Sequence, residues 1–61
     1  MSIEKDTLDQ IRRWAKVRKD KKITQIEMSK ITGVSRPNIA NFENGRVNNM
    51  YLYNMYRSMF D

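Results

Sequence analysis

Residues 24–45 read TQIEMSKITGVSRPNIANFENG and carry the signals of two short helices joined by a tight turn. Thr24 and Glu27 have the spacing of a capping box, in which each side chain hydrogen-bonds the other residue's backbone amide at a helix start. Ser35 is a candidate cap for the second helix. Gly33 lies between the two, where a sharp turn favours a residue without a side chain. This arrangement predicts a helix-turn-helix motif.

The rest of the chain predicts two further helices. Leu8, Ile11 and Trp14 recur at intervals of three residues, as on one face of a helix. Asn44 and Gly45 form a helix exit of the kind in which glycine takes a left-handed conformation. No segment alternates as a half-buried strand does, so we predict an all-α fold in one domain, residues 1–61. The expected helices lie at about 7–20, 25–32, 36–44 and 49–60.

Particular buried and capping positions follow from this pattern. The second helix is expected to bury Met28 and Ile31, and the third to bury Ile39 and Phe42. Asn48 is the expected cap of the fourth helix, because its side chain can accept a bond from a first-turn amide.

The composition excludes several classes of function. A chain of 61 residues has one small core and buries only about 60% of the surface that its unfolded form exposes. It contains no cysteine and no histidine, so the usual metal ligands and the commonest general base are absent. We therefore expect no enzymatic activity, no metal and no cofactor. No apolar run approaches the roughly 20 residues that span a bilayer, so we expect a cytoplasmic protein outside the membrane.

The chain is basic, with 12 Lys and Arg against 7 Asp and Glu and a formal net charge of +5. Seven of the cations fall between positions 12 and 22: Arg12, Arg13, Lys16, Arg18, Lys19, Lys21 and Lys22. A solvated helix face followed by a charged turn would explain such a run. A surface that faces phosphate groups would explain it as well, and the helix-turn-helix that follows favours this second interpretation.

The fourth helix is rich in aromatic residues and methionine. One stripe of apolar side chains can close the core: Leu52, Met55, Tyr56 and Met59. A second stripe lies beside it: Tyr53, Tyr56 and Phe60. Half-exposed tyrosines on a helix are ordinary, but aromatic residues and methionine are also enriched at interfaces between proteins. We expect this second stripe to pack on another copy of the chain.

The start of the third helix carries residues that suit base recognition. A recognition helix enters the major groove of double-stranded DNA with its N-terminal residues toward the base edges. The exposed residues expected there are Arg36, Pro37, Asn38 and Asn41. Arginine can form a bidentate pair with guanine and asparagine with adenine, while proline offers apolar contact to a thymine methyl group.

The segment resembles the helix-turn-helix of the Cro/C1-type (Xre) family of bacterial and phage repressors. The residues that carry the resemblance are Thr24-Gln25, Met28-Ser29, Gly33-Val34-Ser35-Arg36-Pro37, Ile39 and Phe42-Glu43-Asn44-Gly45. The resemblance covers about residues 8–60. It implies a compact four-helix, lambda-repressor-like domain that binds a short, pseudo-palindromic operator as a homodimer.

The resemblance also implies roles for individual residues. Arg36, Pro37 and Asn41 would face bases, with Asn38 at the margin between bases and backbone. Arg18 and Glu43 would form an internal ion pair that ties the first helix to the end of the third. The phosphate contacts that it implies are Gln25, Ser35, Asn44 and Arg46.

Two classes of function are open at this point. The leading hypothesis is a sequence-specific transcriptional regulator that binds double-stranded DNA in the bacterial cytoplasm. It would be a Cro-like protein or repressor of phage or mobile-element origin. The alternative is a protein-interaction module, such as an antitoxin or antirepressor, that uses the aromatic face of the fourth helix.

Overall fold

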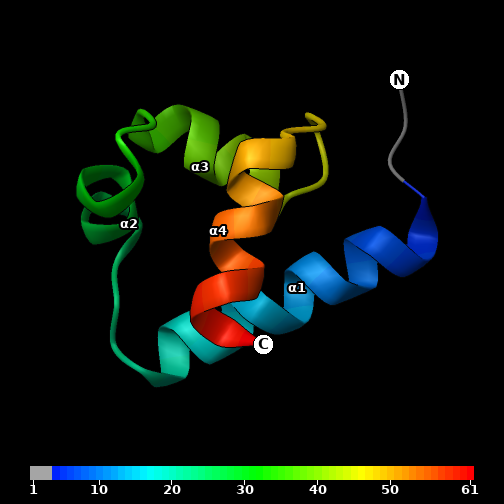
Figure 1. The fold of residues 1–61 in the computed structure, drawn as a ribbon, viewed down its shortest axis with the longest axis horizontal. Coiled ribbons are helices and arrows are strands. Elements are labelled where there is room, and N and C mark those ends of the chain that lie inside the picture. Colours follow the sequence, from blue (N-terminus) through cyan, green and yellow to red (C-terminus); the bar gives the residue numbers. More distant parts are fainter. Residues whose placement is uncertain (1–3) are drawn as a thin grey trace.

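The computed structural model describes residues 4–61, which form four helices joined by short turns and loops (Figure 1). They are α1 (Lys5–Asp20), α2 (Gln25–Thr32), α3 (Arg36–Glu43) and α4 (Met50–Phe60). Every bound lies within two residues of its predicted position, and no strand occurs in this part of the chain. The predicted all-α fold with a central helix-turn-helix is confirmed.

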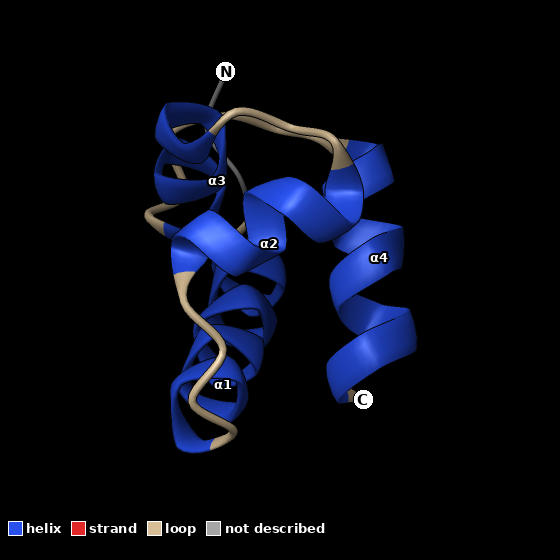
Figure 2. Cartoon of the chain, turned by 90° about the vertical axis from the view of Figure 1, so that its left-hand side faces the viewer, coloured by secondary structure: helices blue, strands red, loops and turns tan. Residues whose placement is uncertain are grey.

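The helices pack in two pairs. α2 and α3 follow each other through a short turn and pack together, while α1 and α4 pack together from opposite ends of the chain. α3 also contacts α1. Figure 2 shows α2 in front, with α1 below it and α4 to its right. The core therefore lies in the space that the four helices enclose.

Every helix contributes to this core. Its buried side chains are Ile11, Trp14, Met28, Ile39, Phe42, Leu52, Tyr56 and Phe60. Met28, Ile39 and Phe42 occupy their predicted buried positions. The apolar stripes that helical spacing predicts on α1 and α3 are the faces that the fold buries.

The prediction that α2 buries Ile31 is wrong, because this side chain is 50% exposed. Thr32 is buried in its place, four residues after Met28 and thus on the same side of the helix. Its hydroxyl donates to the Met28 carbonyl at 2.7 Å and accepts from the Val34 amide at 3.2 Å. These two bonds satisfy the buried hydroxyl, so a polar residue is tolerated at a core position.

The start of α2 is capped as predicted, and the cap of α4 lies one residue later than predicted. Thr24 and Glu27 form the predicted capping box, and each side-chain oxygen accepts from the other residue's amide at 3.1 Å. The prediction that Asn48 caps α4 is wrong by one residue. Asn49 is the cap, and its side chain accepts from the Leu52 amide at 3.0 Å. Because α4 starts at Met50, only the residue directly before it is in place to reach that amide.

Three residues end helices in the left-handed conformation. Gly33 and Gly45 have φ values of 76° and 73°, as predicted for a turn and a helix exit. Lys22 has a φ of 60° and performs the same task at the end of α1. There the Lys22 amide donates to the Lys19 carbonyl and the next amide donates to the Arg18 carbonyl, as in a Schellman motif. Lys22 thus occupies a left-handed position at a helix end that usually holds glycine.

The prediction that one stripe of α4 packs on a second copy is wrong for two of its three residues. Tyr56 is fully buried and Phe60 is 9% exposed, so both side chains pack in the core of the domain and offer little surface to another chain. Their rings contact each other with centroids 5.4 Å apart. Tyr53 is half-buried, and its ring packs edge-on against Trp14 at 4.9 Å.

The residues of both stripes of α4 are buried or half-buried because the three other helices contact it. Trp14 of α1 packs on Tyr53, and Phe42 of α3 lies 5.0 Å from the ring of Tyr56. The Tyr51 hydroxyl donates to the carbonyl of Thr32, the last residue of α2, at 2.7 Å. A helix enclosed on several sides can be apolar over most of its circumference.

Candidate nucleic-acid interface

The outward side of α3 presents the four predicted base contacts. Arg36, Pro37 and Asn38 are exposed and Asn41 is half-exposed, while Ile39 between them is fully buried. The helix therefore has an apolar side in the core and a polar side facing outward. Pro37 lies in the first turn, where its missing amide costs no intrahelical bond.

Ser35 occupies the cap position of α3, but its side chain does not form the capping hydrogen bond that the sequence predicts. Its backbone is extended and its carbonyl accepts from the Ile39 amide at 3.0 Å, which is the first bond of the helix. Its side chain makes no capping bond. The exposed hydroxyl therefore has its hydrogen-bonding capacity available for a ligand, beside Arg36 at the outer face of α3.

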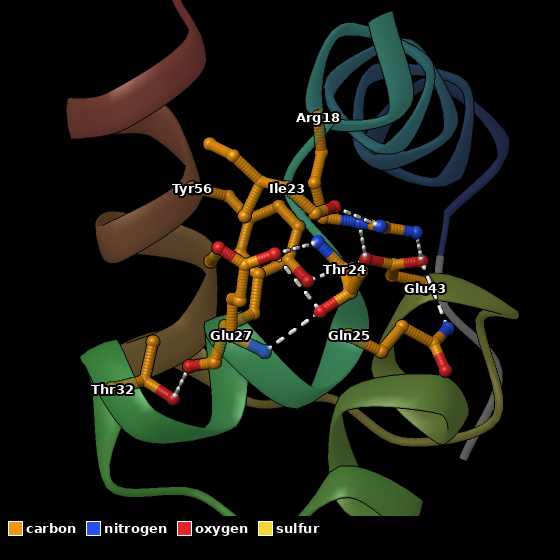
Figure 3. A network of polar contacts seen from close by, with 9 residues as sticks. Arg18, Ile23, Thr24, Gln25, Glu27, Thr32, Glu43 and Tyr56 are labelled. Atoms are coloured by element: carbon orange, nitrogen blue, oxygen red, sulfur yellow. Dashed lines mark hydrogen bonds and ion pairs between the residues drawn. The ribbon is translucent and has the colours of Figure 1, made fainter. Parts of the chain in front are cut away.

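The opposite end of α3 is fixed by a buried ion pair between Arg18 and Glu43 (Figure 3). The Arg18 Nε atom lies 2.7 Å from Glu43 Oε2, and a second guanidinium nitrogen lies 3.0 Å from Glu43 Oε1. The third nitrogen donates to the Ile23 carbonyl at 2.6 Å. Such a bidentate pair fixes the distance and orientation of two helices. The pair that the resemblance implied is present, and it withdraws Arg18 from the surface.

Two more residues donate to the same carboxylate. The Tyr56 hydroxyl lies 2.5 Å from Glu43 Oε2, and the Gln25 amide nitrogen lies 3.2 Å from Glu43 Oε1. Glu43 thus accepts four hydrogen bonds from three residues, and each of the four helices supplies one residue of this cluster. The Tyr56 contact was not predicted from the sequence, because its partner lies 13 residues away and is brought near only by the packing of α4.

These contacts determine the ionisation of the cluster. Burial raises the pKa of Glu43, but the hydrogen bonds from Arg18, Tyr56 and Gln25 and the charge of Arg18 outweigh it and lower that pKa below its ordinary value. Burial and the neighbouring Glu43 carboxylate raise the pKa of the Tyr56 hydroxyl. At neutral pH the carboxylate is charged and the phenol is protonated, so the donor and acceptor roles are fixed.

The predicted phosphate contacts fall into two groups. Gln25 begins α2 and is half-buried beside Glu43, and Asn44 directly follows Glu43 and is exposed. These two therefore lie at the C-terminal end of α3, whereas Ser35 lies at its N-terminal end. Arg46 is exposed in the loop after α3, and its backbone amide donates to the Asn41 carbonyl at 2.9 Å.

A family model described as Helix-turn-helix matches residues 15–48, more than half of the chain. The chain belongs to the Cro/C1-type helix-turn-helix family. Comparison with curated proteins and with solved structures finds no match.

As a Cro/C1-type helix-turn-helix protein, the chain is a DNA-binding regulator of a family that is not enzymatic. The matched region includes both partners of the buried ion pair and every predicted contact to bases or phosphates. Most of α1 and all of α4 lie outside it. Within residues 4–61, no helix is long and apolar enough to span a bilayer.

Proposed function

We propose that this protein is a sequence-specific transcriptional regulator that reads a double-stranded operator with α3 in the major groove. The observation that supports the proposal is the outward face of α3. Its Arg36, Pro37, Asn38 and Asn41 project from a helix whose far end is fixed by the buried Arg18–Glu43 pair. A recognition helix needs both the exposed polar side chains and the fixed position, because base contacts require residues of the right chemistry held in a defined orientation.

Within this proposal, Arg36 and Asn41 are the principal base readers, Pro37 adds apolar contact, and Asn38 lies at the edge of the groove. Gln25, Ser35, Asn44 and Arg46 bind phosphates. The bond from Gln25 to Glu43 uses one of the two hydrogens on its amide nitrogen, which leaves the other for a phosphate oxygen. Glu43 therefore orients a residue that contacts the DNA backbone.

The proposal includes a repressor or Cro-like role, an origin in a bacterium, phage or mobile element, and binding as a homodimer. The proposed dimer surface differs from the stripe that the sequence predicts. Exposed apolar side chains gather at the start of α4 and in the loop before it: Val47, Met50 and Tyr51. The ten residues 47–56 contain no charge, so this stretch adds no repulsion between two chains of net charge +5.

The alternative role in binding another protein rested on an exposed aromatic face of α4. Because Tyr56 and Phe60 are buried, that face is not available to a partner. No feature of residues 4–61 favours this alternative over DNA binding.

Selection of bound sites from random duplexes tests the proposal directly. We expect one enriched sequence, with half-sites about 10 base pairs apart if the protein binds as a dimer. Arg36→Ala should weaken binding to that sequence by about 1–3 kcal/mol and relax the preference at one base pair. Arg57→Ala, at the far end of α4, is the matched control and should leave the preference unchanged. Failure of the unmodified protein to enrich any sequence would refute sequence-specific binding.

A further inference from the structure

A basic hollow lies between α1 and the C-terminal end of α3. Its volume is about 270 Å³. It is lined by Arg12, Ala15, Lys16, Lys19, Glu43 and Asn44. The three cations are exposed and stand at intervals of four and three residues, so they share one face of α1. The hollow is thus a concave site with three positive charges on one wall and an amide on the other.

The charges of this hollow are not neutralised by the fold. Among the described residues, Arg12, Lys16 and Lys19 form no ion pair. Glu43 also lines the hollow, but it is buried and its carboxylate already accepts bonds from Arg18, Gln25 and Tyr56. The negative charge of Glu43 is therefore balanced by Arg18, and the hollow keeps a net positive charge suited to an anion.

The position of the hollow relates it to the reading helix. In the proposed complex α3 lies in the major groove with its N-terminal residues toward the base edges, and its C-terminal end faces the phosphates that flank the groove. Asn44 and Gln25 lie at that end, and the α1 cations continue the same edge outward.

We propose that Arg12, Lys16 and Lys19 form a second phosphate-binding surface, which binds the DNA backbone beyond the groove that α3 reads. This inference rests on the proposed function, since it requires α3 to be in the groove. The surface carries no sequence information, because it meets only phosphates. It adds affinity and salt dependence equally for all duplexes.

The test compares two variants that each remove two positive charges. Lys16→Gln/Lys19→Gln removes cations from the hollow. Arg13→Gln/Arg57→Gln is the control, because these residues line a different hollow, between α1 and α4. Glutamine is a good helix former at all four positions, so both variants are expected to fold, which circular dichroism checks.

Binding to the selected duplex and to a scrambled duplex is measured by fluorescence anisotropy over a range of salt concentrations. For Lys16→Gln/Lys19→Gln, the slope of log affinity against log salt should become shallower by about 0.9 for each phosphate that the variant no longer neutralises. At 0.1 M salt this amounts to about eightfold weaker binding per phosphate, by the same factor for both duplexes. The control should keep the slope of the unmodified protein.

Three results would overturn the inference while leaving the proposed function in place. The first is an unchanged slope in Lys16→Gln/Lys19→Gln. The second is an equal change in Arg13→Gln/Arg57→Gln, which would mean that overall charge acts rather than this surface. The third is a loss of preference between the two duplexes in Lys16→Gln/Lys19→Gln, since phosphate contacts do not distinguish sequences. If the unmodified protein binds neither duplex, both the inference and the proposed function fail.

Discussion

At the scale of single residues, the Glu43 carboxylate is the most constrained group in the described chain. It is buried, charged and held by Arg18, Gln25 and Tyr56. Removing one partner of a buried ion pair leaves the other charge without compensation, which costs more than the pair itself contributes. Substitution at this position should therefore affect the whole fold.

We expect Glu43→Gln to lower the free energy of unfolding by about 3 kcal/mol, because Arg18 is left buried without an opposite charge. A domain of this size has only several kcal/mol of stability in total, so the variant should be largely unfolded on mild warming. Urea unfolding followed by circular dichroism measures the difference. Glu27→Gln is the control, since glutamine also serves in a capping box, and it should cost less than about 0.5 kcal/mol. Equal stability of the two variants would contradict the role given to Glu43.

The same cluster predicts how stability depends on pH at both extremes. The pKa of Glu43 is lower in the folded state than its ordinary 4.5, so its contribution is complete above that value and is lost as the pH falls through the folded-state pKa. The pKa of Tyr56 is raised above its ordinary 10.0, so its contribution is complete below pH 10 and declines as the pH rises further.

Thermal unfolding of the protein and of Tyr56→Phe between pH 2 and pH 11 tests this dependence. The unmodified protein should lose stability below about pH 4.5 and above about pH 10. Tyr56→Phe should be less stable at neutral pH by about 1.5–3 kcal/mol, as expected for a hydrogen bond to a charged group. Its alkaline decline should be smaller, because the group that titrates there is absent. Parallel alkaline declines in the two proteins would refute the assignment to Tyr56.

At the scale of the elements, several helix ends are set by interactions between residues that are close in the sequence. The capping box at Thr24 and the left-handed exits at Gly33 and Gly45 involve residues that lie within a few positions of one another. Such signals can be read directly from the sequence, which is why the bounds of α2 and α3 were predicted to within one residue. The end of α1 lacked such a signal, because Lys22 takes the left-handed conformation without being glycine.

Lys22→Gly should raise the free energy of unfolding. A side chain in the left-handed region costs about 1–2 kcal/mol, and glycine removes this cost while adding about 0.5–1 kcal/mol of entropy to the unfolded state. The expected net gain is about 0.5–1 kcal/mol, measured by urea unfolding. Lys21→Gly is the control, because Lys21 has a φ of −82° that any residue adopts. Lys21→Gly should be neutral or destabilising, and a gain there equal to that of Lys22→Gly would contradict the explanation.

The parts of the fold that sequence reasoning missed all depend on contacts between distant elements. Ile31 and Thr32 are both compatible with a buried face of α2, and the choice between them is made by the position of α3 and α4. Tyr56 looked suited to an interface, but α3 supplies both Phe42 and the Glu43 carboxylate that bury and satisfy it. The residues expected to contact bases were easier to anticipate, because their exposure follows from the buried positions of α3 itself.

At the scale of the whole molecule, the distribution of charge separates two surfaces. Cations gather on α1 beside the C-terminal end of α3, while residues 47–56 are uncharged. Because the chain has a net charge of +5, a second copy meets less repulsion at an uncharged surface than at the basic face of α1. The surface proposed for self-association and the surface proposed for DNA therefore do not compete.

Met50→Glu should weaken the proposed dimer. Met50 is 67% exposed, so the substitution leaves the core intact but places a charge in the apolar contact. Sedimentation equilibrium of the unmodified protein should show dimers, and that of Met50→Glu should show monomers at the same concentration. Ser58→Glu adds the same charge near the C-terminal end of α4 and should leave association unchanged. A monomeric unmodified protein, both alone and on its selected site, would refute the dimer.

The convergence of four helices on Glu43 also limits how the protein can open. If α3 melted on its own, the Arg18 guanidinium would remain in the core without its carboxylate, and α2 and α4 would each be left with one hydrogen bond fewer. The least costly way to open the reading helix is therefore to unfold the whole domain. Amide hydrogen exchange should show this as nearly equal protection of Phe42 and of the Trp14 backbone in α1. Such a protein keeps its recognition helix in one orientation before it binds DNA, so the binding free energy is not reduced by the entropy cost of ordering that helix.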